Sequence, residues 1–184
     1  MQTNTQKRLN VMLEAALIAA LATVLSIIVP SVASFDISLG IIPLIIYSLR
    51  RGLKAGLLAG FLWGVLPILL GKASVLTIWQ SLVEYPIANL VVGLSGIYAD
   101  KIKTALKNKK KFSWYLFWAV FVSTSAKYLL HFYAGFIYWG KYAQWGLGPF
   151  MYSLVINGGS LIINLIIAWV VVSAIILRIP NLIK

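Results

Sequence analysis

Three ionisable side chains, Glu84, Lys127 and His131, lie within long apolar stretches of the 184-residue sequence. Titratable groups inside the hydrocarbon layer of a membrane are energetically costly, so we expect each of them to serve a function. The rise of an α-helix puts Glu84 roughly 14 Å, Lys127 roughly 16 Å and His131 roughly 10 Å below the predicted outer surface. The three side chains are therefore predicted to lie at one level of the outer leaflet.

Lys127, His131 and Gly135 recur every four residues and so share one face of a helix. Gly135 lacks a side chain and leaves room for another group to approach the backbone. Asn157, in the last apolar stretch, falls roughly 12 Å below the same surface, and Tyr152 is shallower. These positions predict the wall of a pocket that opens to the outside.

A single acid among aromatic rings is suited to an organic cation, because the carboxylate neutralises the charge and ring faces attract it. Glu84 supplies the acid, while Trp139 and Tyr152 can supply the rings. His131 and Asn157 both donate and accept hydrogen bonds, which suits a heteroaromatic ring with amino and ring-nitrogen groups.

Each of these residues also has a structural interpretation. Glu84 and Lys127 can form an ion pair inside the bundle. His131 can be a buried histidine with an internal partner, and Asn157 can link two helices. Trp139 can belong to the aromatic belt at the membrane interface.

Other chemistries lack the residues they need. With one His and no Cys, the chain falls short of the usual metal-ligand sets. It contains no phosphate-binding Gly-rich motif, no HExxH and no Ser/His/Asp arrangement. We therefore predict that it is not an enzyme, holds no cofactor or metal and does not hydrolyse ATP itself.

The composition explains which elements carry the pocket. Hydrophobic residues make up 61% and charged residues 11% of the chain, and its mean hydropathy is +0.91, which excludes a water-soluble domain. Long continuous apolar runs favour helices over a barrel. We predict an all-α integral membrane protein with one domain, residues 1–184, and six spans at about 10–29, 38–49, 53–71, 75–99, 112–137 and 149–177. The second span is short and contains Pro43, so we expect it to be bent or to cross only part of the membrane.

The net charge of +12 indicates membrane topology. With the N-terminus in the cytoplasm, thirteen of the 16 Lys and Arg residues lie inside, and only Lys72 and Lys141 lie outside. Both termini are then cytoplasmic. The basic stretch 101–111 resembles a nucleic-acid patch, but contact with anionic lipid is preferred and no nucleic acid is expected. The first span also resembles a signal peptide, but its length and Glu14 favour an uncleaved helix.

Small residues mark two helix faces. Ala15/Ala19 and Ala16/Ala20 form small-xxx-small pairs, which permit close contact with a helix of this chain or of a partner. The spacing leaves both possibilities open. Glycines 52, 56 and 60 on the third span are predicted to serve packing within the chain.

The sequence resembles the thiamine-specific substrate-binding subunits (S-components, ThiT) of energy-coupling factor (ECF) vitamin transporters along nearly its whole length. The resemblance rests on SLRRGLKAGLLAGFLWG (48–64), LVEYPIANLVVGLSG (82–96), KYLLHFYAGFIYWGKYAQWG (127–146) and YSLVING (152–158). It implies a six-helix S-component in a bacterial plasma membrane that captures thiamine from outside. It also implies partners: a transmembrane coupling subunit and two cytoplasmic subunits that use ATP.

The resemblance also assigns roles to single residues. Glu84 would face the thiazolium cation, and Trp139 would stack on the ligand ring. The rest of the ligand site would comprise Lys127, His131, Tyr152, Asn157, Tyr85, Gly135 and Trp63. Ala16 and Ala20 match the family's docking motif.

The chain departs from the family in two places. Ser74 stands where a tyrosine would contact the ligand, and the first outer loop, SVASFD (31–36), lacks the tryptophan expected in a lid. Phe35 is expected to substitute as a hydrophobic plug. Asp36 is expected to replace an acid two residues later, where Ser38 lies.

Three other functions stay open at this point. One is an S-component for another vitamin or a thiamine precursor. Another is a self-contained secondary transporter, in which Glu84 and His131 would carry protons. A third is a structural or assembly protein without a small ligand.

Overall fold

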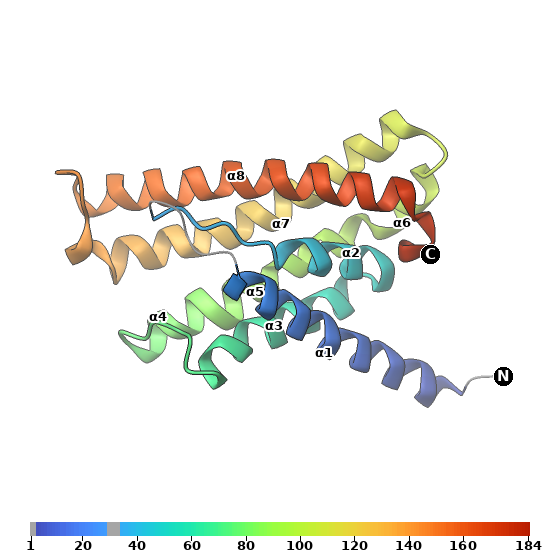
Figure 1. Cartoon of the computed structure of the whole chain (residues 1–184), viewed down its shortest axis with the longest axis horizontal. Coiled ribbons are helices and arrows are strands. Elements are labelled where there is room, and N and C mark those ends of the chain that lie inside the picture. The colour runs from blue at the N-terminus through green and yellow to red at the C-terminus, as the bar shows by residue number, and fades with distance from the viewer. Residues whose placement is uncertain (1–2, 29–33) are drawn as a thin grey trace.

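The computed structural model describes residues 3–28 and 34–184. Six helical segments build the bundle (Figure 1): α1 (Asn4–Ile28), α2 (Ile41–Arg51), α3 (Leu53–Leu69), a composite fourth segment (Ile78–Ala105), α7 (Lys109–Ile137) and α8 (Pro149–Arg178). Two short 3-10 turns, η3 (Gly140–Tyr142) and η4 (Pro180–Ile183), follow α7 and α8. The all-α architecture with six helices agrees with the sequence-based prediction.

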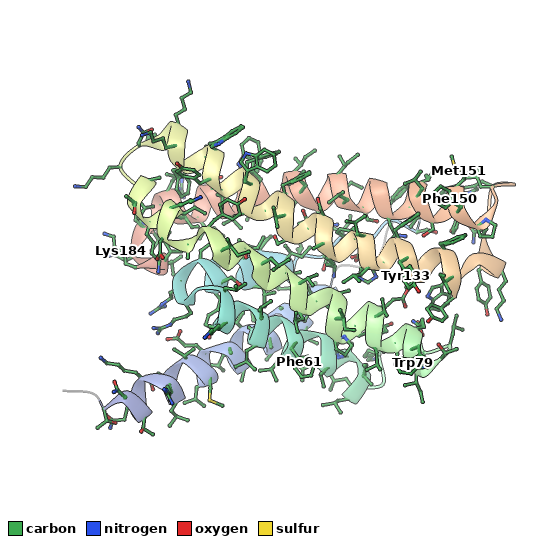
Figure 2. The ribbon with its side chains drawn as sticks, turned by 180° about the vertical axis from the view of Figure 1, so that it is seen from behind. Phe61, Trp79, Tyr133, Phe150, Met151 and Lys184 are labelled. Carbon is green, nitrogen blue, oxygen red and sulfur yellow. The ribbon has the colours of Figure 1, made fainter. Side chains whose placement is uncertain are left out.

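Three of these segments are long and apolar enough to cross a membrane by length and composition: α1, the fourth segment and α8. Apolar side chains also project from the outside of the bundle. Phe61, Trp79, Phe150 and Met151, labelled in Figure 2, are 43% or more exposed. Large apolar surfaces of this kind are typical of contact with lipid or with another protein.

The second helix has only 11 residues, with Pro43 in its first turn, where a missing N–H costs no helical hydrogen bond. Residues 34–40 precede it without helical structure. Side chains of α8 satisfy their backbone: Ser160 Oγ accepts from Asp36 N at 2.9 Å, and Asn164 Oδ1 accepts from Ser38 N at 2.8 Å. Non-helical backbone is tolerated at membrane depth only where protein groups satisfy it in this way.

The fourth segment is not the regular helix predicted for 75–99. It consists of α4 (Ile78–Leu82), the π-helix η1 (Val83–Ile87), α5 (Ala88–Leu90), the 3-10 helix η2 (Val91–Tyr98) and α6 (Ala99–Ala105). Pro86 lies inside the π-helix. Proline has no backbone N–H, so the α-helical hydrogen-bond pattern cannot continue unchanged through it. Glu84 therefore lies on a distorted turn, a feature frequent at functional sites.

Glycines allow α3 to pack backbone to backbone against the fourth segment. A Cβ atom on Gly56 would overlap Ser48 and approach Gly93 Cα, and one on Gly60 would overlap the carbonyl of Asn89. The prediction that these two glycines serve packing within the chain is confirmed. Gly52, the third of the predicted series, has φ +83° and separates α2 from α3, a conformation that glycine adopts without strain.

The two faces of α1 differ. Ala15 and Ala19 are fully buried in the core, whereas Ala16 and Ala20 are exposed. The first pair therefore makes the contact within this chain, and the second pair leaves a free surface of small side chains.

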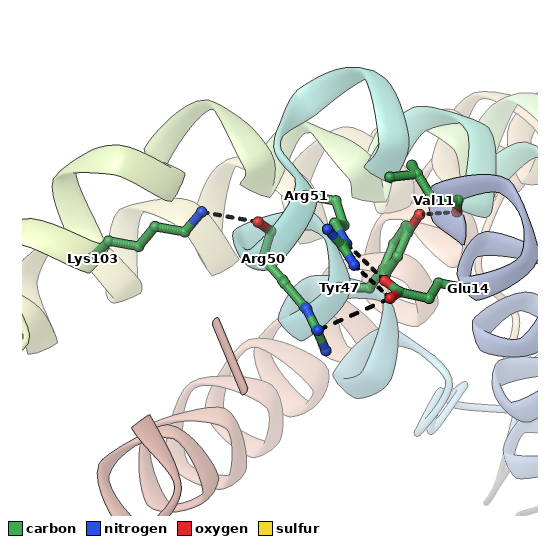
Figure 3. A network of polar contacts seen from close by, with 6 residues as sticks. All are labelled: Val11, Glu14, Tyr47, Arg50, Arg51 and Lys103. Atoms are coloured by element: carbon green, nitrogen blue, oxygen red, sulfur yellow. Dashed lines mark hydrogen bonds and ion pairs between the residues drawn. The ribbon is translucent and has the colours of Figure 1, made fainter. Parts of the chain in front are cut away.

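Both described ends of the chain lie at one end of the bundle, and α4 and the α7–α8 connection lie at the other (Figure 1). Near the terminal end, Arg51 of α2 donates two hydrogen bonds to Glu14 of α1, at 2.7 and 2.5 Å (Figure 3). Tyr47 donates to the Val11 carbonyl at 2.7 Å and joins the same two helices. Polar contacts thus attach α1 to the bundle beside its alanine face.

Candidate ligand-binding site

A cavity of about 160 Å³ lies between the π-helix, α7 and α8, at the end of the bundle opposite the termini. Its lining comes from these three elements and from the residues just after α7: Glu84, His131, Gly135, Trp139, Tyr152, Ser153, Ile156 and Asn157. Six of these eight residues are among the predicted ligand residues. The structure thus brings together residues that lie up to 73 positions apart in the sequence.

The Glu84 carboxylate is half-buried and receives hydrogen bonds from two neutral groups. Trp139 Nε1 donates to Oε1 at 2.8 Å, and Gln80 Nε2 donates to Oε2. Among the described residues, the ion pairs within 4.0 Å all involve Glu14 instead. The negative charge of Glu84 is therefore hydrogen-bonded but not neutralised by a basic side chain.

His131 contributes a free polar atom. Its Nε2 is buried and has no hydrogen-bond partner among the described residues. A buried polar atom without a partner costs free energy unless water or a ligand satisfies it. This observation speaks against the interpretation of His131 as an internally satisfied core histidine.

The two aromatic residues of the cavity lining, Trp139 and Tyr152, each lie beside another aromatic ring. Trp139 lies 5.7 Å from Tyr142 between ring centroids, and Tyr152 lies 5.5 Å from Trp145 in an edge-to-face arrangement. Trp139 is also bound to Glu84 through its indole N–H, so its role extends beyond an interfacial belt. Ring faces and a carboxylate are thus present in the same small space.

Helix α8 approaches the backbone of α7 closely at Gly135. A Cβ at this position would overlap Ser153 Oγ and lie 3.2 Å from Asn157 Nδ2. Asn157 donates to the carbonyl and hydroxyl oxygens of Ser153, at 3.0 and 3.1 Å. Both of these bonds stay within α8, so these contacts do not link α8 to another helix.

Lys127 lies outside the cavity lining, although it shares a helix face with His131. It is buried, its Nζ donates to Asn89 Oδ1 at 2.9 Å, and it lies 4.7 Å from the centroid of the Trp63 ring. The alternative of a Glu84–Lys127 ion pair is therefore not supported. Asn89 and Trp63 hold the ammonium group in place instead.

Two further predicted ligand residues also lie outside the lining. Trp63 is 2% exposed, and its ring faces Lys127 rather than the cavity. The Tyr85 hydroxyl accepts a hydrogen bond from the backbone N–H of Ser74 at 2.7 Å. Tyr85 thus anchors the connection between α3 and α4 at Ser74.

The predicted lid residues pack against the bundle. Phe35 touches α8 at Gly159, where a Cβ would overlap its ring. Asp36 accepts a hydrogen bond from the Tyr128 hydroxyl at 2.8 Å. Neither residue lines the cavity, and residues 31–33 of the predicted lid lie outside the described residues.

Sequence reasoning missed four residues near the site: Ser153 and Ile156 in the lining, Gln80 beside Glu84, and Asn89 beside Lys127. A signal existed for two of them. Gln80 precedes Glu84 by one helical turn, and Ser153 precedes Asn157 by one turn. The Asn89–Lys127 contact joins two helices and has no such signal.

The fold and the site together define a class: a helical membrane protein with a small pocket that carries an unneutralised carboxylate, aromatic rings and a free imidazole nitrogen. Such a pocket is suited to a small organic cation. Residues 3–28 and 34–184 contain no cluster of three or more His, Asp and Glu side chains able to hold a metal ion.

Comparison with known proteins gives the family. The family described as "Thiamine transporter protein" matches residues 12–184. The chain is 39% identical to the thiamine transporter ThiT of Lacticaseibacillus paracasei, over 96% of this chain and 91% of that protein. It is 30% identical to the ThiT of Bacillus subtilis over 66% of this chain and 64% of that protein. The chain belongs to the thiamine transporter protein family, as its resemblance to ThiT proteins predicted.

A solved structure supports the same assignment. ThiT from Listeria monocytogenes matches with a TM-score of 0.92 and 36% identity, covering 96% of this chain and 98% of that chain. The relatives are named as transporters, in agreement with the prediction that the chain is not an enzyme.

Proposed function

We propose that this chain is a substrate-binding membrane subunit that captures thiamine from outside the cell and passes it to an ATP-driven partner complex. The observation that carries the proposal is the Glu84 carboxylate in a cavity with aromatic walls. It has neutral hydrogen-bond donors and, within residues 3–28 and 34–184, no basic partner. Thiamine carries a fixed positive charge on its thiazolium ring. A permanent cation gains from an anion whose charge no protein cation has cancelled.

The remaining residues suit the rest of the molecule. Trp139 offers an aromatic face for stacking beside the cation. His131 Nε2 and the Asn157 amide can pair with the amino group and ring nitrogens of the pyrimidine. We further propose that Lys127, Tyr85 and Trp63 contribute from behind the cavity, because each lies in a segment that matches the family motifs.

Ligand entry requires a local rearrangement. The cavity, at about 160 Å³, is smaller than most small-molecule sites, which span about 300–1,000 Å³. The indole N–H of Trp139 also occupies Glu84 Oε1. We propose that thiamine displaces this hydrogen bond and widens the space between α7 and α8, and that Phe35 and Asp36 take part in closing the site.

Intrinsic tryptophan fluorescence tests the binding step. The detergent-purified chain is titrated with thiamine and with its uncharged pyrimidine fragment. Strong, saturable quenching by thiamine and weak quenching by the fragment are expected, and E84Q should remove most of the difference. If thiamine gives no response, the ligand assignment is wrong and other vitamins become candidates.

The partner complex would comprise an ECF transmembrane coupling subunit and two cytoplasmic ATPases, in the plasma membrane of a bacterium. The exposed pair Ala16 and Ala20 supports a docking surface on α1, because small side chains let another helix approach closely. Their neighbours Ala15 and Ala19 already face this chain's own core.

Uptake assays test the docking step separately from binding. Ala16→Leu should abolish thiamine uptake by cells that supply the partner subunits, while thiamine binding by the purified chain stays unchanged. Leu13→Ala, at another exposed position of α1, serves as the control and should keep uptake. Uptake that persists without any ATPase and stops with an uncoupler would instead indicate a self-contained transporter.

A further inference from the structure

Gln80 makes an unusually complete set of hydrogen bonds for a side chain next to a binding pocket. It is fully buried, with 0% exposure. Its Nε2 donates to the Ser74 carbonyl at 3.1 Å and to Glu84 Oε2, while its Oε1 accepts from Leu76 N at 2.9 Å. Both amide donors are therefore occupied, and rotation of the amide would break several bonds at once.

The start of the helix fixes the position of this side chain. Thr77 caps α4, and its hydroxyl oxygen accepts from Gln80 N at 3.1 Å. Gln80 lies one helical turn before Glu84, so the two side chains meet on one face. The helix cap thus fixes the backbone of Gln80, and the backbone groups of Ser74 and Leu76 fix its side-chain amide.

Whether the donor to Glu84 is neutral or positively charged determines the net charge of the site. A basic side chain at this position would hold Glu84 but would also cancel its charge. An amide stabilises the carboxylate by a hydrogen bond and leaves the net charge in place. Trp139 acts on the other oxygen with an equally neutral donor. Lys127, a buried basic residue of the neighbouring helix α7, donates to Asn89 instead.

We propose that Gln80 is a positioning residue that holds the Glu84 carboxylate towards the cavity as an unneutralised anion, and so sets the preference of the site for a cationic over a neutral ligand. This inference rests on the proposed binding of thiamine. It concerns a residue that lies outside the cavity lining and acts only through Glu84.

The test compares two ligands by isothermal titration calorimetry of the full chain in detergent. One is thiamine, and the other is an analogue in which a neutral thiophene replaces the thiazolium ring. Gln80→Met keeps the length of the side chain and removes both donors. We expect its affinity for thiamine to fall about 10- to 100-fold, since hydrogen bonds to charged groups are the strong ones. The affinity for the neutral analogue should change by less than about threefold.

A second variant probes the charge directly. Gln80→Lys retains a donor to Glu84 but adds a positive charge that neutralises it, and it should remove the preference for thiamine. Gln144→Met, at an exposed glutamine, is the matched control and should leave both affinities unchanged. Binding of the neutral analogue also reports that each variant is folded.

Two results would overturn the inference. If both ligands lose affinity equally in Gln80→Met, the residue has only a structural role. If both variants keep the wild-type ratio of affinities, Gln80 does not set the preference. The proposed function fails separately, when the unmodified chain does not bind thiamine at all.

Discussion

Glu14 and Glu84 are two acids of the same helical bundle with different partners. Glu14, towards the end that carries the termini, is bound by the guanidinium of Arg51, and Arg50 lies 3.9 Å away (Figure 3). Glu84, towards the other end, receives hydrogen bonds from the neutral donors Gln80 and Trp139 and from no basic side chain among the described residues. One carboxylate is neutralised by this chain, and the other keeps a charge that a ligand can use.

The partners of the two carboxylates indicate that Glu14 has a structural role, whereas Glu84 is available to bind a ligand. An ion pair within the chain joins α1 to α2 and stabilises the bundle. A carboxylate without a cation beside a small cavity is costly to keep in an apolar environment. Binding a permanent cation recovers part of that cost, so the ligand itself completes the electrostatics of the site.

The largest expected effect comes from removing the free charge. Glu84→Gln should weaken thiamine binding about 30-fold or more, because loss of one partner of a desolvated charge pair costs about 2–5 kcal/mol. Calorimetric titration of the purified variant measures the change. The same substitution at the other acid, Glu14→Gln, should alter the affinity by less than about threefold, since that charge is already neutralised. Equal losses in the two variants would contradict the comparison.

A smaller effect is expected at the free imidazole. His131→Leu should weaken thiamine binding about 2- to 10-fold, because one hydrogen bond between ligand and protein contributes about 0.5–1.5 kcal/mol. Ser125 offers a matched control, because its hydroxyl is also buried without a partner in the described part of the chain but does not line the cavity. Ser125→Ala should bind thiamine as the unmodified chain does. A fall in both variants would indicate a general loss of packing.

The smallest effect is expected on the stability of the bundle. Glu14→Gln removes the ion pair to Arg51, whose partners are each about one-third exposed, so it should lower stability by about 1 kcal/mol or less. A thermal unfolding scan in detergent should give a slightly lower Tm. Glu84→Gln should not lower the Tm, because it removes a charge that has no cationic partner in the bundle. A larger loss of Tm at Glu84 than at Glu14 would reverse the assignment of structural and binding acids.

Helical periodicity selected several residues that line the candidate cavity. His131 and Gly135 were placed on one face by their spacing of four, and both line the cavity. The estimated depth along the spans predicted that Glu84 and Asn157 lie at a similar height. Both residues also line the cavity. The same reasoning selected Lys127, which the structure places outside the lining, because depth does not say which neighbouring helix a side chain will face.

The fourth span illustrates another limit. Its apolar run and length predicted a membrane helix, and the structure has a helical segment there. The π-turn around Glu84 was not predicted, although Pro86 lies within it. A proline indicates that a helix is disturbed, but the packing of α3 against this segment decides what form the disturbance takes.

The sequence by itself determined the helical membrane architecture and the family, because hydrophobic run length, helical period and motif order are properties of the chain. Only the tertiary structure decided that Glu84 faces neutral donors while Lys127 binds Asn89, and that Ala15 is buried while Ala16 is exposed. Those outcomes depend on how neighbouring helices are rotated against one another. The period of one helix fixes which residues share a face, but it does not fix which face meets a neighbour.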